Sequence, residues 1–119
     1  MALNFDIRHV SDVAIVDLGG RLTLGEASGT LRKTIKELLG EGHRNILLNL
    51  AGVSYIDSSG LGELVGAFAT VANRGGALKL LNLQKRVNEL MQVTKLLTVF
   101  ETFTDENAAV RSFARAAAV

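Results

Sequence analysis

The sequence predicts an α/β fold, with a mixed, mostly parallel β-sheet, an antiparallel N-terminal strand and about four helices packed against the sheet. Apolar runs of strand length alternate along the chain with helical patterns of about 10–16 residues. The run at residues 46–50 is apolar enough for a strand buried on both faces, which is typical of parallel sheets. Residues 5–9 instead alternate between outward and inward positions, and an extended apolar pattern then runs from Val13 to Gly19 and Gly20, as expected of an opening β-hairpin.

The chain of 119 residues suits one domain covering residues 1–119, because this length supports one hydrophobic core and no stretch has the composition of a linker. Although 48% of the residues are apolar, charges interrupt them, and no window approaches the roughly 20 apolar residues of a membrane span. The first residues also lack a basic segment followed by an apolar one. We therefore expect a soluble, cytoplasmic protein without a membrane span.

Composition argues against several kinds of chemistry. The net charge is +1, the basic residues form no stripe, and one Tyr and five Phe offer little for base stacking, so we expect no direct nucleic-acid binding. The absence of Cys excludes disulfides and thiolate metal sites. The two histidines, His9 and His43, lie in separate segments. We expect no metal, no cofactor and no catalytic residue.

The N-terminal hairpin is expected to lead into a helix. Thr23 followed by Glu26 has the spacing of a capping box, in which each side chain bonds the other residue's backbone N–H. Gly40 and Gly42 are expected to end this helix. Its predicted inner face consists of Ala27, Leu31, Ile35, Leu38 and Leu39.

The centre of the chain has the clearest pattern. After the strand at residues 46–50 the chain passes through Ala51, Gly52 and Val53 into a tight loop, and a helical pattern then extends over residues 58–73. The turn at Gly75 and Gly76 is expected to close that helix.

The C-terminal third continues the alternation of strands and helices. A short strand is predicted at residues 77–81, a helix at 84–92 and a last strand near 97–103. A final helix opens at residues 104–106 and has high helix propensity. Its expected apolar face, which would cap the sheet, consists of Val110, Phe113 and Ala114.

The loop before the central helix contains the candidate functional residues Asp57, Ser58, Ser59 and Gly60. One interpretation is purely structural, because Asp and Ser are preferred helix N-caps and either Asp57 or Ser58 could satisfy the free N–H groups of the helix. A helical wheel supports a second interpretation, since it places Leu61, Val65, Phe68 and Ala72 inward. The opposite side is nearly bare and consists of Ser59, Gly62, Glu63, Gly66, Ala67 and Thr70.

A bare helix face favours the docking of another protein. Glycine in a helix costs about 1 kcal/mol, so Gly62 and Gly66 need a reason, and close approach of a partner is one. Relief of a crowded internal contact is the alternative. A phosphate on Ser58 or Ser59 would lie at the rim of such an interface and add about −1.5 to −2 charges. The helix N-terminus would tolerate the phosphate while the interface would not, so phosphorylation would release the partner.

The spacing of residues around the two serines does not match known catalytic or phosphate-binding motifs. A serine at a strand-to-helix turn is similar to the nucleophile elbow of α/β-hydrolases, but residues 55–60 contain no Gly-x-Ser-x-Gly, and neither histidine follows the serine. The loop also lacks the Gly-x-x-x-x-Gly-Lys pattern of a phosphate-binding loop.

The run NLAGVSYIDSSGLG at residues 49–62 resembles the signature of the STAS domain, and most closely that of the small bacterial anti-sigma factor antagonists, or anti-anti-sigma factors. The resemblance extends over most of the chain and implies the STAS fold and a partner-switching role in transcription regulation. It implies that the unphosphorylated form binds an anti-sigma factor, itself a serine kinase, and so frees a sigma factor. It further implies that this kinase phosphorylates Ser58, that a PP2C-type phosphatase reverses the modification, and that the antagonist has no cofactor.

Two questions stay open at this point. The chain could instead be a constitutive STAS interaction subunit of a lipid-transport or signalling assembly, docking through the same face without phosphorylation. We expect a monomer because antagonists exchange between partners, although the Ala-rich last helix could serve a dimer.

Overall fold

The predicted α/β fold is confirmed by a computed structural model, which describes residues 3–117, with side chains as far as residue 114. The elements follow each other in the order β1 (Asn4–Val10), β2 (Val13–Leu22), α1 (Glu26–Gly40), β3 (Asn45–Ile56), α2 (Ser58–Asn73), β4 (Ala77–Leu81), α3 (Lys85–Val93), the 3-10 helix η1 (Leu96–Thr98), β5 (Thr102–Phe103) and α4 (Glu106–Ala117).

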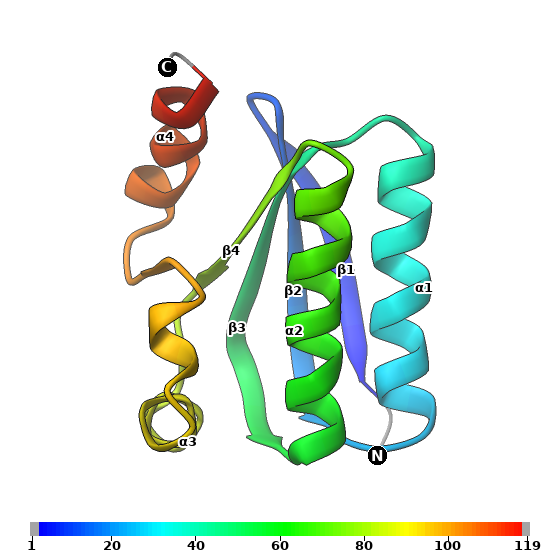
Figure 1. The fold of residues 1–119 in the computed structure, drawn as a ribbon, viewed down its shortest axis with the longest axis vertical. Coiled ribbons are helices and arrows are strands. Elements are labelled where there is room, and N and C mark those ends of the chain that lie inside the picture. Colours follow the sequence, from blue (N-terminus) through cyan, green and yellow to red (C-terminus); the bar gives the residue numbers. More distant parts are fainter. Residues whose placement is uncertain (1–2, 118–119) are drawn as a thin grey trace.

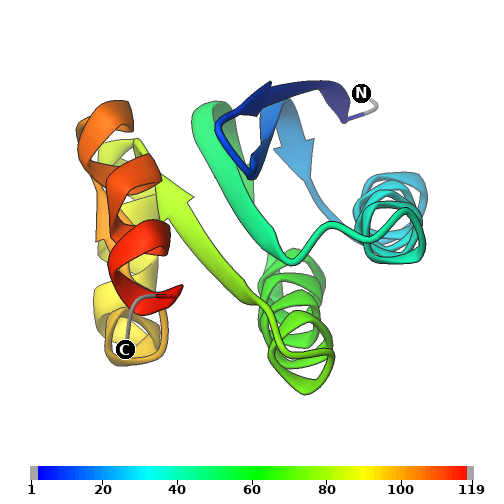
Figure 2. The ribbon, with the colours of Figure 1, turned by 90° about the horizontal axis from the view of Figure 1, so that it is seen from above.

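The strands form one sheet in the order β1-β2-β3-β4-β5. β1 is antiparallel to β2, and all other neighbouring pairs are parallel. Figures 1 and 2 show α1 and α2 together on one face, while α3 and α4 lie beyond β4. The side chains of β3 that point to α1 and α2 join the larger apolar core. On the other face α4 covers a smaller core that contains Val13, Ile15, Leu47, Leu81, Ala109 and Phe113.

β3 is longer than expected, because it continues to Ile56 rather than ending at residue 50. The extra length comes from pairing with β2, which holds Leu22 opposite Ile56. Glycines allow the two strands to approach, since a Cβ on Gly52 would lie 2.9 Å from the Leu18 carbonyl oxygen. The strand therefore ends directly at the candidate functional residues, with Asp57 alone between β3 and α2.

The capping box predicted from Thr23 and Glu26 is wrong. α1 begins at Glu26 with Gly25 as its N-cap, and since glycine has no side chain, no side-chain bond caps the free N–H groups of this helix. Gly25 has a φ of 104°, which other residues rarely adopt, so the chain turns there and not at Thr23. The predicted inner face of this helix is confirmed, as all five of its apolar residues are buried.

Two expectations for the C-terminal third need correction. The strand predicted near residues 97–103 is only Thr102–Phe103, because the chain turns at Lys95, which has a positive φ, and Leu96–Thr98 then form the 3-10 helix. Ala114 is exposed rather than inward. The buried side of α4 is formed by Ala109, Ser112 and Phe113, and the Ser112 hydroxyl accepts a 2.9 Å hydrogen bond from the Lys79 ammonium.

Candidate functional site

Asp57 is the N-cap of α2. Its Oδ1 accepts a hydrogen bond from the Gly60 N–H at 2.8 Å, and its Oδ2 accepts one from the Leu24 N–H at 3.0 Å. The first bond is ordinary capping, while the second joins the loop between β2 and α1 to the start of α2. Of the two caps left open by the sequence, the structure assigns the role to Asp57, and Ser58 becomes the first residue of the helix.

The two loops meet because β2 and β3 are parallel, so that their carboxyl ends lie at the same edge of the sheet. The Asp57 N–H donates to the Leu22 carbonyl at 3.2 Å. Gly60 packs closer still, since a Cβ at this residue would lie 2.1 Å from the Leu22 carbonyl oxygen. Only glycine fits at residue 60 without moving the backbone.

Hydrogen bonds from the Gly60 and Leu24 N–H groups hold the pKa of the Asp57 carboxyl below its ordinary value. The native state therefore releases this proton at a lower pH than the unfolded chain does. The resulting stabilisation is complete above the unfolded pKa of about 4 and disappears as the pH falls through the folded pKa.

We expect Asp57→Asn to lower stability at neutral pH, because the charged acceptor of two N–H bonds is lost. The difference from the wild type should shrink as the pH falls below about 4, where the wild-type carboxyl also becomes neutral. Urea unfolding midpoints of both proteins at neutral and acidic pH measure this. A difference that stays constant with pH would contradict the role given to the Asp57 charge.

The two serines differ in access. Ser58 is exposed at the first turn of α2, while Ser59 is half-buried. A hydroxyl at a helix N-terminus lies where a phosphate is electrostatically favoured. Ser58 is therefore the more accessible of the two candidate modification sites.

The exposed side predicted for α2 is only partly correct. Ala67 is buried, and so are Leu64 and Val71, whereas Val65 and Ala72, which the wheel placed inward, are exposed. The helix is rotated relative to the prediction because α1 packs along one of its flanks. The wheel could not reveal this, since apolar spacing alone does not show which flank a second helix covers.

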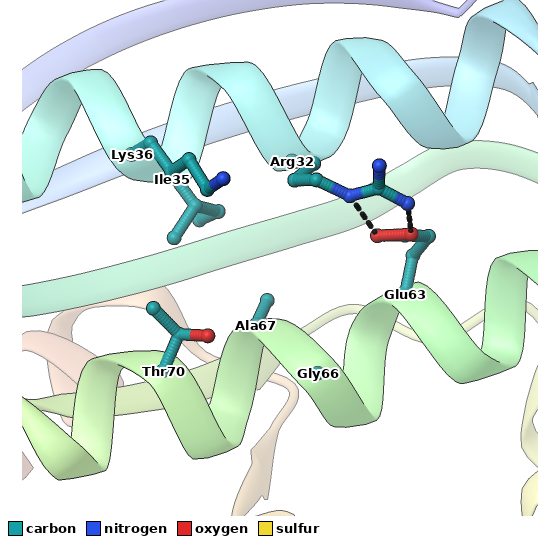
Figure 3. Close-up of a pocket in the computed structure, with 7 residues that line it drawn as sticks. All are labelled: Arg32, Ile35, Lys36, Glu63, Gly66, Ala67 and Thr70. Atoms are coloured by element: carbon teal, nitrogen blue, oxygen red, sulfur yellow. Dashed lines mark hydrogen bonds and ion pairs between the residues drawn. The ribbon is translucent and has the colours of Figure 1, made fainter.

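α1 and α2 enclose a cleft of about 270 Å³, which Figure 3 shows between the two helices. At one end the Arg32 guanidinium pairs with the Glu63 carboxylate, so Glu63 serves the contact between helices rather than a bare surface. Ile35 and Ala67 lie between this pair and the other end, where Lys36 and Thr70 are found.

Gly62 and Gly66 stay exposed, and a Cβ at either would meet no atom within 4 Å. The alternative explanation of these glycines, relief of a crowded internal contact, is therefore wrong. Apart from Glu63, α2 carries no charged side chain. Six of its exposed residues form a smooth, uncharged surface, which we call the α2 face; it consists of Ser58, Gly62, Val65, Gly66, Ala69 and Thr70.

No pattern in the sequence indicated two further features at this end of the sheet. Leu24 is 77% exposed although it is apolar, and the Asp57 bond fixes its backbone next to α2. On the other side the Arg21 guanidinium stacks on the Tyr55 ring at 4.5 Å. That ring also borders a cavity of about 350 Å³ beside α3, which is lined by Tyr55, Ile56, Arg86, Val87, Glu89, Leu90 and Val93.

Among residues 3–117, no group of three or more His, Asp or Glu side chains is placed to hold a metal ion. Within the same described part, no helix is both long and apolar enough to cross a membrane.

The chain is similar to known proteins along most of its length. The family model described as "STAS domain" matches residues 4–109. The anti-sigma-B factor antagonist of Bacillus subtilis is 34% identical over 101 residues, which cover 85% of this chain and 91% of the relative. The anti-sigma F factor antagonist of Paenibacillus polymyxa is 26% identical over 107 residues, covering 89% and 91%. An anti-sigma factor antagonist from Mycobacterium paratuberculosis shares the fold, with a TM-score of 0.82 at 14% identity over 94% of each chain.

Proposed function

The chain belongs to the STAS domain family, and we propose that it acts as an anti-sigma factor antagonist whose binding to its partner is controlled by phosphorylation of Ser58. Relatives named as antagonists of anti-sigma-B and anti-sigma F factors support the first half of this proposal. In this role the chain is a regulatory binding protein of the cytoplasm and not an enzyme.

The observation that carries the second half is the position of Ser58. It is exposed at the first residue of α2, and the carboxylate before it is occupied by two backbone N–H groups. A phosphate there adds charge beside the positive end of the helix dipole, so the fold tolerates it. A partner bound on the same surface would have to desolvate that charge, so the phosphate destabilises the complex.

The α2 face and Leu24 supply the docking surface in this proposal. The α2 face begins at Ser58, and the backbone of Leu24 is bonded to the N-cap of the same helix; neither carries a charged side chain. Exposed apolar residues grouped around a modifiable serine suit a contact that forms and breaks. The bound protein is the anti-sigma factor, which acts as the serine kinase, and a PP2C-type phosphatase restores the binding form.

Mass spectrometry of the intact chain from its native cell, with fragment mapping across residues 53–74, tests the proposal. A phosphate on Ser58 in a growth-dependent fraction is the expected result. A chain that is never phosphorylated under any condition in which it is expressed would overturn the switch and favour the constitutive interaction subunit. A phosphate found only on Ser59 would overturn the assignment to Ser58.

The docking surface has its own prediction. We expect Gly66→Arg to weaken partner binding about tenfold or more, because it places a long charged side chain on the α2 face. Stability should not fall, since a Cβ at residue 66 meets no atom and arginine is a better helix former than glycine.

Gly40→Arg is the matched control. Gly40 is also exposed in a helix with open space around it, but it lies at the end of α1 distant from Ser58. Titration calorimetry with the purified anti-sigma factor measures both variants. Equal loss of binding in the two would show that added charge, and not its place on the α2 face, causes the effect.

A further inference from the structure

β1 is an edge strand with an unprotected edge. It pairs with β2 in continuous register from Asn4 opposite Gly19 to Val10 opposite Val13. On its other side Figure 2 shows no element of the described chain. Natural proteins usually protect such edges with charged residues, above all lysine, with proline or with a bulge. The β1 sequence NFDIRHV has no proline, no lysine and no register shift, and its two charges, Asp6 and Arg8, have opposite signs.

The free edge offers the backbone groups of alternate residues. In a hairpin with a two-residue turn, the residues flanking the turn, here Val10 and Val13, exchange hydrogen bonds with each other. Hydrogen-bonded pairs alternate with non-hydrogen-bonded pairs, so every second residue before Val10 also bonds to β2. The residues between them, Phe5, Ile7 and His9, direct their backbone N–H and C=O groups away from β2. Phe5 and Ile7 are also two of the large apolar side chains that the fold leaves exposed, at 42% and 39%.

The β1 sequence is complementary to itself when two copies run antiparallel. A two-fold axis at Ile7 places Ile7 opposite Ile7 of the second copy and Phe5 opposite His9. In this register Asp6 faces Arg8 of the second copy, and Arg8 faces Asp6. The outward backbone groups of Phe5, Ile7 and His9 then pair with each other, and the Asp6 and Arg8 side chains fall in the closer, non-hydrogen-bonded pairs.

The Asp6 carboxylate would be stabilised by the Arg8 guanidinium of the second copy. Across β1 and β2 it lies directly opposite Asp17, a like charge that is unfavourable at this spacing. Arg8 donates four hydrogen bonds, two to Asp17 and two to Glu106. A guanidinium has five N–H donors, so one is left, and the Arg8 side chain is 40% exposed.

We propose that two copies of this chain associate through β1, in antiparallel register about Ile7, to form one continuous sheet. A single strand pair buries less than the roughly 1,000 Å² of a stable interface, so the dimer is reversible and forms only at high concentration. This proposed dimer differs from the monomer expected from the sequence. Because β2 separates β1 from β3 and α2, both Ser58 sites stay open and the dimer presents two docking surfaces.

Sedimentation equilibrium over a wide concentration range tests the association. The wild type is expected to dimerise, and Ile7→Asp, which brings two carboxylates together at the axis, should weaken association about tenfold or more. Val99→Asp is the control, since Val99 is also 39% exposed but lies outside β1. A wild type that stays monomeric at millimolar concentration, or an Ile7→Asp variant that dimerises as well as the wild type, would overturn the proposal.

Single cysteines test the register, because the chain has no Cys of its own. Hydrogen-bonded partners lie about 5.5 Å apart at Cα, so Ile7→Cys should form an intermolecular disulfide on mild oxidation. Phe5→Cys should not, because its copy lies four residues along the strand, about 14 Å away. Equal cross-linking of the two variants would overturn the register about Ile7.

Discussion

Replacing Ser58 by glutamate is expected to weaken binding to the anti-sigma factor on the order of 100-fold. An unpaired charge desolvated in an interface costs a few kcal/mol, and each 1.4 kcal/mol is a factor of ten. The fold should be unaffected, because a negative charge at the first residue of α2 is favourable there. Ser58→Ala should bind like the wild type and accept no phosphate.

Ser11→Glu supplies the control for this experiment. Ser11 is also exposed, but it lies in the turn between β1 and β2, at the end of the sheet opposite Ser58. Titration calorimetry with the anti-sigma factor recovered alongside the wild-type chain measures the affinities, and thermal unfolding reports the fold. Undiminished binding of Ser58→Glu would contradict a release switch at this residue.

Gly60→Ala should be strongly destabilising, by about 3 kcal/mol, although it adds one methyl group. The new Cβ would lie 2.1 Å from the Leu22 carbonyl oxygen and 2.9 Å from its carbonyl carbon, so backbone must move. Overpacking of this kind costs 1–3 kcal/mol and occasionally more. For a domain of this size the melting temperature should fall by about 12 °C.

Gly62→Ala is the matched substitution two residues later in the same helix. No atom lies within 4 Å of its new Cβ, and alanine is a better helix former by about 1 kcal/mol. We therefore expect opposite signs from the same chemical change, with Gly62→Ala melting a few degrees above the wild type. Differential scanning calorimetry measures the melting temperatures of both variants. Equal melting temperatures would show that the backbone at Leu22 moves aside without a loss of stability.

These two predictions concern neighbouring residues of α2 that act on different targets. Phosphorylation at Ser58 acts on the partner, whereas Gly60 acts on the loop between β2 and α1 through Leu22. Because Asp57 joins Leu24 to α2, displacement of this loop in Gly60→Ala should also move Leu24 on the docking surface. Loss of binding in Gly60→Ala is therefore expected alongside its loss of stability.

The sequence by itself determined the elements whose signals are local. α2 occupies Ser58–Asn73 and β4 occupies Ala77–Leu81, as predicted, because an Asp cap begins the helix and a glycine with a φ of 80° follows it. The exposed serine at the helix start was predictable for the same reason, since the cap and the first turn are adjacent in the chain.

Tertiary structure decided what depends on residues distant in the sequence. β3 reaches Ile56 because β2 pairs with it, and α1 starts at Glu26 after a loop whose Leu24 N–H is bound by Asp57, 33 residues away. The flank of α2 that became buried was set by α1, which also took Glu63 into an ion pair with Arg32. Spacing along one helix defines its apolar stripe, but only the packed neighbours determine how much of the remaining surface is left for a partner.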